Sequence, residues 1–271
     1  DLMGHWQPYS SMTRYADDPL VLGTVMALIV LGGIGFFVWD DIAKNQWHFR
    51  NYTLQTKVVL TTTALLLILP FLWFWLCEFV HWNGMSTGKQ ALSALFQTVS
   101  PRTAGFNNVD LNQLSGGSKL LTILLMLVGG SPSSTAGGIK TTTLAILLLA
   151  LRAAFTSDHQ VHCFGRRIPA QVITRTLVVS VLYGTLFLVA SMALIQLEPV
   201  TMEEALFECA SAIGTVGLTL GITPELGAVS KGILILLMYL GRVGGLTLVY
   251  AVSGTGKRLH YTLPEESIGI G

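Results

Sequence analysis

Charged residues are scarce in this chain of 271 residues. Asp, Glu, Lys and Arg make up 11% of the sequence, whereas soluble domains carry about 25%. Hydrophobic residues make up 51%. This composition excludes an ordinary soluble domain and is typical of an integral membrane protein. The formal net charge of +1 gives no electrostatic reason to expect a nucleic-acid partner.

Cysteine is also scarce. The three thiols, Cys77, Cys163 and Cys209, form no Cys-x-x-Cys pair, so neither a disulfide framework nor a zinc site is predicted. His159, His162 and Cys163 cluster in a polar loop without a nearby carboxylate, and ordinary loop residues are the favoured interpretation over a metal site. Because no nucleophile or acid–base constellation stands in a suitable setting and no ATP motif is present, we predict no enzyme activity and no cofactor.

Apolar runs, in contrast, are long and frequent. A helix of about 20 apolar residues crosses the roughly 30 Å hydrocarbon core of a bilayer. Two further segments, 90–100 and 203–213, are too short to cross. The sequence therefore predicts an all-α integral membrane protein whose candidate spans are 20–39, 58–79, 120–154, 172–194 and 233–252.

One candidate span is interrupted in its middle. Gly129–Thr143 reads Gly-Gly-Ser-Pro-Ser-Ser-Thr-Ala-Gly-Gly-Ile-Lys-Thr-Thr-Thr, between the apolar segments 120–128 and 144–151. Such residues at bilayer depth are costly unless protein or a water-filled cavity surrounds them. A phosphate-binding loop needs adjacent Gly-Lys after a strand, and here Ile139 separates Gly138 from Lys140. We therefore favour a broken helix that lines a polar pathway. The two alternatives are a phosphate-binding loop and a cytoplasmic loop between two short buried helices.

Basic residues predict the orientation. Loops on the cytoplasmic side of membrane proteins are enriched in Lys and Arg. One side of the predicted spans carries nine such residues and the other carries five, which places the first set in the cytoplasm: Lys44, Arg50, Lys57, Arg152, Arg166, Arg167, Arg175, Lys257 and Arg258, against Arg14, Lys89, Arg102, Lys119 and Lys231. Both short segments then enter from outside and return outside, as re-entrant pore helices do.

The chain also repeats itself. Thr103-Ala104-Gly105-Phe106 recurs as Thr215-Val216-Gly217-Leu218, and Gly129 recurs as Gly241, both at an offset of 112 residues. The repeated unit is a span, a short helix, a loop and a second span. The chain thus holds two units and the end of another, because Leu31-Gly32-Gly33 resembles Val128-Gly129-Gly130.

A Thr-x-Gly loop after a short helix suits cation conduction. Rings of backbone carbonyls replace the water around a cation and let it leave again. Glycine tolerates the unusual backbone angles that aim carbonyls inward, and the C-terminal end of the short helix is negative. Since one loop supplies only part of a ring, several loops must converge around an axis.

These motifs resemble the Ktr/Trk/HKT superfamily of potassium transporters, most closely the KtrB type of membrane subunit, with the TrkH type also similar. Pro264-Glu265-Glu266 is similar to the tail of that subunit. The resemblance implies a potassium-channel-like fold of four membrane-pore-membrane units around one pseudo-fourfold pore. Residues 1–271 would form a single transmembrane pore domain in which 1–43 end the second unit, 57–155 form the third, 171–257 form the fourth and 258–271 form a cytoplasmic tail. The preceding units are expected to be missing from this chain.

The resemblance also implies roles for individual residues. Gly105 and Gly217 would be the filter glycines, and the carbonyls of the residues before them would bind potassium. The filter would comprise Thr103, Ala104, Gly105, Phe106, Thr215, Val216, Gly217 and Leu218. An intramembrane gating loop would lie below it, together with a basic residue of the last helix: Gly129, Gly130, Ser131, Ser133, Ser134, Thr135, Gly137, Gly138, Lys140 and Arg242.

By the same resemblance, the transported ion would be K⁺, with Na⁺ as a second or coupled ion. The subunit would form a homodimer in the cell membrane, as a multi-pass protein of a bacterial inner membrane, on a cytosolic ring of nucleotide-binding regulatory subunits of the KtrA or TrkA type. Two alternatives stay open on the sequence. One is a secondary transporter of another small solute that uses discontinuous helices, and the other is a non-conducting membrane assembly subunit.

Overall fold

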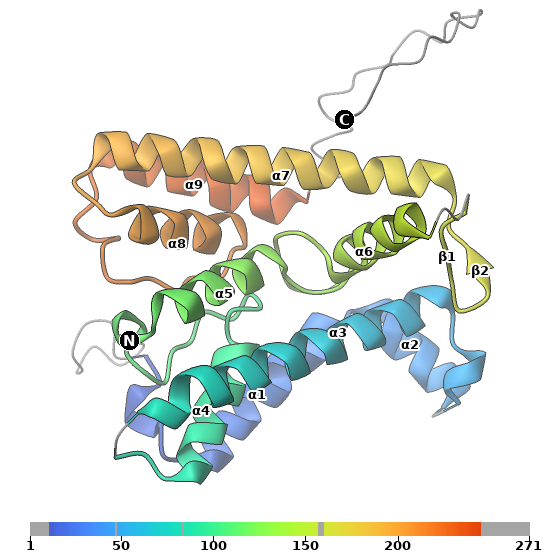
Figure 1. The fold of residues 1–271 in the computed structure, drawn as a ribbon, viewed down its shortest axis with the longest axis horizontal. Helices are drawn as coiled ribbons and strands as arrows, with labels where there is room; N and C mark the ends of the chain where they lie inside the picture. The colour runs from blue at the N-terminus through green and yellow to red at the C-terminus, as the bar shows by residue number, and fades with distance from the viewer. Residues whose placement is uncertain (1–10, 47, 83, 157–159, 245–271) are drawn as a thin grey trace, which may run out of the picture.

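A computed structural model describes residues 11–46, 48–82, 84–156 and 160–244. The described chain is mostly helical, with one small hairpin (Figure 1). Its elements are α1 (Pro19–Ile34), α2 (Phe36–Asn45), α3 (Leu54–Trp73), α4 (Thr87–Val99), α5 (Gly116–Leu127), α6 (Thr141–Phe155), β1 (His162–Cys163), β2 (Arg166–Arg167), α7 (Ala170–Leu197), α8 (Met202–Ile213) and α9 (Ala228–Val243).

Two helical stretches of the described residues are long and apolar enough to cross a membrane. They are Leu54–His81, in which α3 continues through a π-helical turn and a 3₁₀ turn, and α7. A third is added if the bent pair α1 and α2 is counted as one span. α7 exposes the large apolar side chains of Leu188, Val189 and Met192. Such an exposed apolar surface suits contact with lipid.

The first predicted span differs from the expectation that residues 20–39 cross the bilayer as one segment. α1 ends at Ile34, and α2 leaves it at an angle of 89°. The bend is at Gly35, whose φ of 95° is open to glycine and rarely to other residues. A Cβ on Gly35 would stand 2.5 Å from the carbonyl oxygen of Pro132, so the bend also needs glycine for space.

The predicted interruption of residues 120–154 is confirmed. α5 ends at Leu127 and α6 begins at Thr141, with an irregular segment between them. A parallel bridge joins its two ends, since Gly129 N donates to Ile139 O at 2.9 Å and Ile139 N donates to Leu127 O at 3.1 Å. The segment therefore closes on itself as a compact loop, here called the 128–140 loop.

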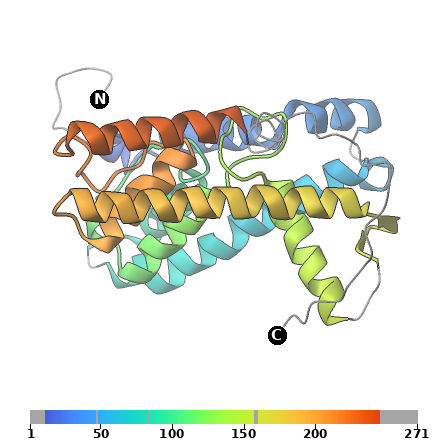
Figure 2. The ribbon, with the colours of Figure 1, turned by 90° about the horizontal axis from the view of Figure 1, so that it is seen from above.

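The core lies around the short helix α8. Figures 1 and 2 show α8 beside α7 and α9, which run next to each other in both views. Almost every side chain of α8 from Ala205 onward is buried. The large cluster around it also takes side chains from α5, α7 and α9. A thirteen-residue helix, α4, occupies the corresponding place after α3.

Some expectations fall wholly or partly outside the described residues. α9 begins at Ala228, before the predicted start at 233, and ends at Val243; the rest of the predicted last span, the tail, Lys257, Arg258 and the Pro264–Glu266 motif lie outside. His159 lies outside as well, while His162 and Cys163 form β1. Within the described ranges no group of three or more His, Cys, Asp or Glu side chains could hold a metal.

Candidate functional site

The two Thr-x-Gly loops share one unusual backbone. Thr103 and Gly105 have φ values of 70° and 77°, and Thr215 and Gly217 have values of 54° and 96°. Left-handed backbone is strained for a β-branched residue such as threonine. The central Ala104 does not share it. A backbone that alternates in hand turns successive carbonyls to one side, whereas a strand alternates them between two sides.

Each loop is held by the short helix that precedes it. In the first loop, Ala104 N and Gly105 N both donate to Ser100 O, at 3.1 Å and 3.3 Å. In the second, Val216 N donates to Ser211 O at 2.8 Å and Gly217 N donates to Ser211 Oγ at 3.0 Å. These bonds attach both loops to the C-terminal ends of α4 and α8, where the helix dipole is negative.

The loops also touch each other. A Cβ added to Gly105 would lie 2.1 Å from Val216 O and 3.3 Å from Gly217 C, so only glycine fits. Val216 and Leu218 are buried, and Phe106 is exposed. Segments more than one hundred residues apart therefore meet backbone to backbone.

The 128–140 loop packs directly against both Thr-x-Gly loops. A Cβ on Gly137 would stand 2.1 Å from Thr215 Oγ1, and one on Gly129 would stand 3.1 Å from Thr103 Cγ2. Gly138, with φ 65°, lies against Gly214. The predicted gating segment and the predicted filter segments are thus brought together by glycines that leave no room between them.

Hydrogen bonds attach the 128–140 loop to α9 and also connect residues within the loop. Arg242, in the last turn of α9, donates to Thr135 O, and Lys140 Nζ donates to Ala136 O at 2.6 Å. Ser134 Oγ accepts from Ala136 N at 3.3 Å.

Buried hydroxyls close the base of the same loop. Ser131 Oγ lies 3.0 Å from Thr141 Oγ1, and Thr141 N donates to Gly130 O at 3.1 Å. Both hydroxyl residues are fully buried. The start of α6 is therefore fixed to the segment that follows α5.

The bend at Gly35 between α1 and α2, here called the α1 hinge, belongs to the site and was missed by the sequence analysis. Ser131 N donates to Gly33 O at 2.9 Å, and Phe36 N donates to Ser133 O at 3.1 Å. Ser133 itself has a left-handed φ of 61°. The available signal was the glycine cluster at 32–35 just before Asp40-Asp41, which the repeat aligns with the 128–140 loop.

The same hinge geometry recurs at the end of α9. Gly35 has φ 95° and ψ 148°, and Gly244 has φ 89° and ψ 136°. The repeat offsets that align Gly32 with Gly129 and Gly129 with Gly241 also align Gly35, Pro132 and Gly244. α1 and α9 therefore stop at aligned positions, Ile34 and Val243, whereas α5 stops earlier in the alignment, at Leu127.

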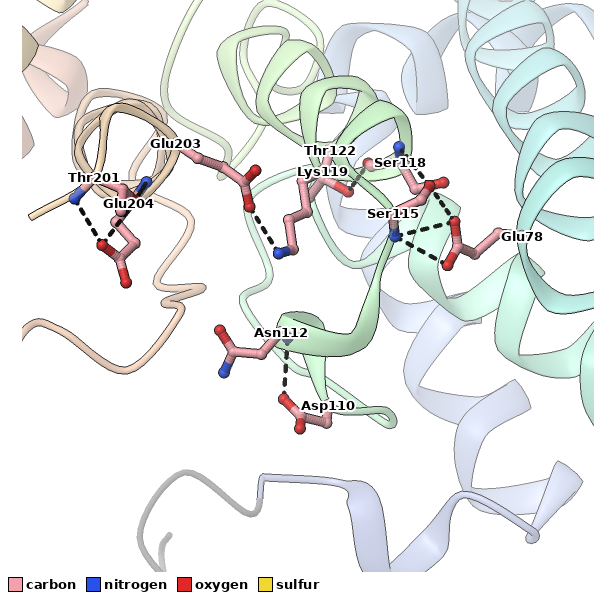
Figure 3. A network of polar contacts seen from close by, with 10 residues as sticks. All are labelled: Glu78, Asp110, Asn112, Ser115, Ser118, Lys119, Thr122, Thr201, Glu203 and Glu204. Atoms are coloured by element: carbon pink, nitrogen blue, oxygen red, sulfur yellow. Dashed lines mark hydrogen bonds and ion pairs between the residues drawn. The ribbon is translucent and has the colours of Figure 1, made fainter. Parts of the chain in front are cut away.

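Carboxylates hold the other end of the repeat. Glu78 accepts from Ser115 N at 3.1 Å at the start of α5 (Figure 3). Glu198 accepts from Gly227 N at 2.7 Å and from Ser230 Oγ at 2.6 Å at the start of α9. These hydrogen bonds, the one from Ser230 first, lower the pKa of Glu198 below its ordinary value of 4.5.

Ion pairs connect successive units at this same end. Lys119 Nζ on α5 lies 2.7 Å from Glu203 Oε1 on α8 (Figure 3). Lys89 Nζ on α4 lies 2.6 Å from Asp17 Oδ2, just before α1. In both cases the start of a second helix is paired with the start of the next unit's short helix.

Polar side chains behind the Thr-x-Gly loops are used for hydrogen bonding. The Glu208 carboxylate on α8 accepts from the hydroxyls of Thr219 and Thr223. Asn108 Nδ2 donates to Ser93 Oγ at 3.1 Å. These bonds secure the segments that leave each loop.

The chain is similar to known proteins in sequence and in fold. The cation transport protein family TrkH matches residues 7–256. The chain is 41% identical to the potassium/sodium uptake protein NtpJ of Enterococcus hirae, covering 100% of this chain and 60% of that protein. It is 38% identical to the Ktr system potassium uptake protein B of Vibrio alginolyticus, covering 96% and 58%. The chain thus spans less than two thirds of the length of these relatives.

A solved structure shows the same fold. The potassium transporter TrkH from Vibrio parahaemolyticus superposes with a TM-score of 0.76 at 22% identity, over 91% of this chain and 54% of that one. At that identity the likeness concerns the fold alone. Taken with the match over residues 7–256, these findings show that the chain belongs to the TrkH family of cation transport proteins.

Proposed function

We propose that this chain is the larger part of a potassium-uptake subunit in which the two Thr-x-Gly loops bind the ion through backbone carbonyls. The observation that carries the proposal is the shared left-handed backbone at Thr103, Gly105, Thr215 and Gly217, in two loops that meet. Backbone carbonyls suit K⁺ because they replace its hydration without a fixed charge that would retain it.

The full pore is proposed to be pseudo-fourfold. Residues 57–155 supply the third membrane-pore-membrane unit, 171–257 the fourth and 1–43 the end of the second. Two observations support it: the ion pairs between successive units and the common stop of α1 and α9 at aligned positions. α4 and α8 would be the re-entrant pore helices, each aiming its negative end at the ion.

The 128–140 loop is proposed to be the gate. It lies against both Thr-x-Gly loops and is held by Arg242 through Thr135 O. Irregular backbone is tolerated at membrane depth where it lines a cavity. Movement of the loop would open the path, and the Arg242 charge would set the barrier to cations.

Potassium is the proposed substrate, with sodium as a second ion. Support comes from relatives whose names include potassium uptake and potassium/sodium uptake. We further propose a multi-pass location in a bacterial cell membrane, a homodimer, and a cytosolic ring of nucleotide-binding subunits that would hold any regulatory nucleotide.

The test is growth at limiting potassium in a bacterium that lacks its own uptake systems. The complete protein containing this chain is compared with its Gly217→Asp variant at equal membrane expression. Rescue by the parent and loss in the variant are expected, because a carboxylate at Gly217 would retain or displace the ion. Equal rescue by both would refute the assignment of the loop, and no rescue by a well-expressed parent supplied with its regulator would refute the function.

A further inference from the structure

Arg102 is a buried cation directly before the first Thr-x-Gly loop. Its side chain is 6% exposed. Throughout the described residues it forms no ion pair, and its Nε finds no acceptor. Arg242, in contrast, is exposed and bonded to Thr135 O. The two arginines therefore occupy different environments.

The surroundings of Arg102 place it behind the loop. It lines a cavity of about 10 Å³ together with Ile29, Val30 and Gly33 of α1, Val99 of α4, and Gly130. That volume is about one water position. Apart from Arg102 the lining is apolar side chains and glycine backbone, so no carboxylate in the cavity pairs with the guanidinium beside Thr103.

Stability does not explain a charge in such a place. Removing a guanidinium from water without a carboxylate partner is unfavourable, and an apolar side chain of similar volume often serves the fold as well or better. A feature that costs stability and persists beside a strained loop points to function.

Comparison of the two repeated units shows that only the first Thr-x-Gly loop is preceded by an arginine. The position equivalent to Arg102 in the second loop is Gly214. A Cβ there would stand 2.3 Å from Met126 O, so no side chain fits. One loop has a positive charge at its start and the other has tightly packed backbone.

We propose, resting on the potassium-uptake function above, that Arg102 is a positioning residue that lowers the cation affinity of the Thr103–Gly105 loop. Its fixed positive charge opposes the negative C-terminal end of α4, which otherwise attracts the ion. The Thr215–Gly217 loop, with Gly214 in the same place, keeps the full effect of α8. The two loops then hold the ion unequally, and the weaker side promotes release.

The experiment measures initial rates of K⁺ uptake into proteoliposomes that contain the complete protein, over a range of external K⁺. Variants are Arg102→Met, which removes the charge, Arg102→Lys, which keeps it, and Arg152→Met as a control for charge loss on the cytoplasmic end of α6. Arg102→Met is expected to lower the KM for K⁺ about tenfold, a size typical of one nearby charge at an effective dielectric constant near 20. The melting temperature of the Arg102→Met variant should not fall below that of the parent.

The comparison with lysine distinguishes charge from shape. Arg102→Lys and Arg152→Met are expected to keep the parental KM within about twofold. A parental KM in Arg102→Met would overturn the inference. So would an Arg102→Met protein that fails to accumulate while Arg102→Lys accumulates, because Arg102 would then pair with an acidic group elsewhere in the pore. A parent that transports no K⁺ would overturn the proposed function itself.

Discussion

The contact between Gly137 and Thr215 gives the sharpest test of how the 128–140 loop meets the Thr-x-Gly loops. A Cβ at position 137 would stand 2.1 Å from Thr215 Oγ1 and 3.1 Å from Thr215 Cβ. Because Ile139 N and Thr215 N are held by hydrogen bonds to Leu127 O and Ala212 O, Gly137→Ala must push the loops apart. Overpacking of this kind costs about 1–3 kcal/mol, and it should also slow K⁺ uptake because the Thr215 backbone moves.

A double-mutant cycle isolates this contact. In a Thr215→Ala background the 2.1 Å clash is absent, and the penalty of Gly137→Ala should fall below about 1 kcal/mol. Gly184→Ala on α7 is the control: no atom lies within 4 Å of its added Cβ, and alanine favours helix by up to about 1 kcal/mol. Thermal unfolding of the complete protein in detergent gives the values. Additive effects of the two substitutions would refute the reasoning.

Three further outcomes are expected. Glu198 has a lowered pKa in the folded state, so its hydrogen bonds stabilise the protein above the unfolded pKa near 4.5, and this stabilisation is lost as the pH falls through the folded pKa. The melting temperatures of Glu198→Gln and the parent should therefore converge at acidic pH. A difference that stays constant with pH would contradict this. Glu203→Gln should cost no more than about 1 kcal/mol, since the ion pair with Lys119 is partly exposed; a larger loss in denaturation would show a coupled network. Arg242→Gln should raise the maximal uptake rate, because it weakens the bond to Thr135 O; a slower rate would exclude its role as a barrier.

Much of the fold follows from local sequence. The offset of 112 residues aligned two loops whose backbones prove alike at Thr103 and Thr215. Glycine, proline and hydroxyl residues within an apolar run correctly predicted the break between α5 and α6, because such residues neither favour a lipid-exposed helix nor pack as one.

Other features depend on contacts that the sequence does not display. The bend at Gly35 arises because its backbone approaches Pro132 O, almost one hundred residues away. Hydropathy alone predicts that residues 20–39 form one continuous membrane span. Likewise, the burial of Arg102 behind its loop depends on contacts with α1. The sequence analysis counted Arg102 only as one of the external basic residues, and that count does not predict burial.

The central claim is that the carbonyls of the two Thr-x-Gly loops bind the transported cation. Anomalous diffraction from crystals of the complete protein soaked in thallium, a K⁺ substitute with a strong signal, tests it directly. The account predicts a peak coordinated by carbonyl oxygens of Thr103, Ala104, Thr215 and Val216, lost when K⁺ is replaced by a large organic cation. Peaks confined to other sites, with none between these loops, would contradict it.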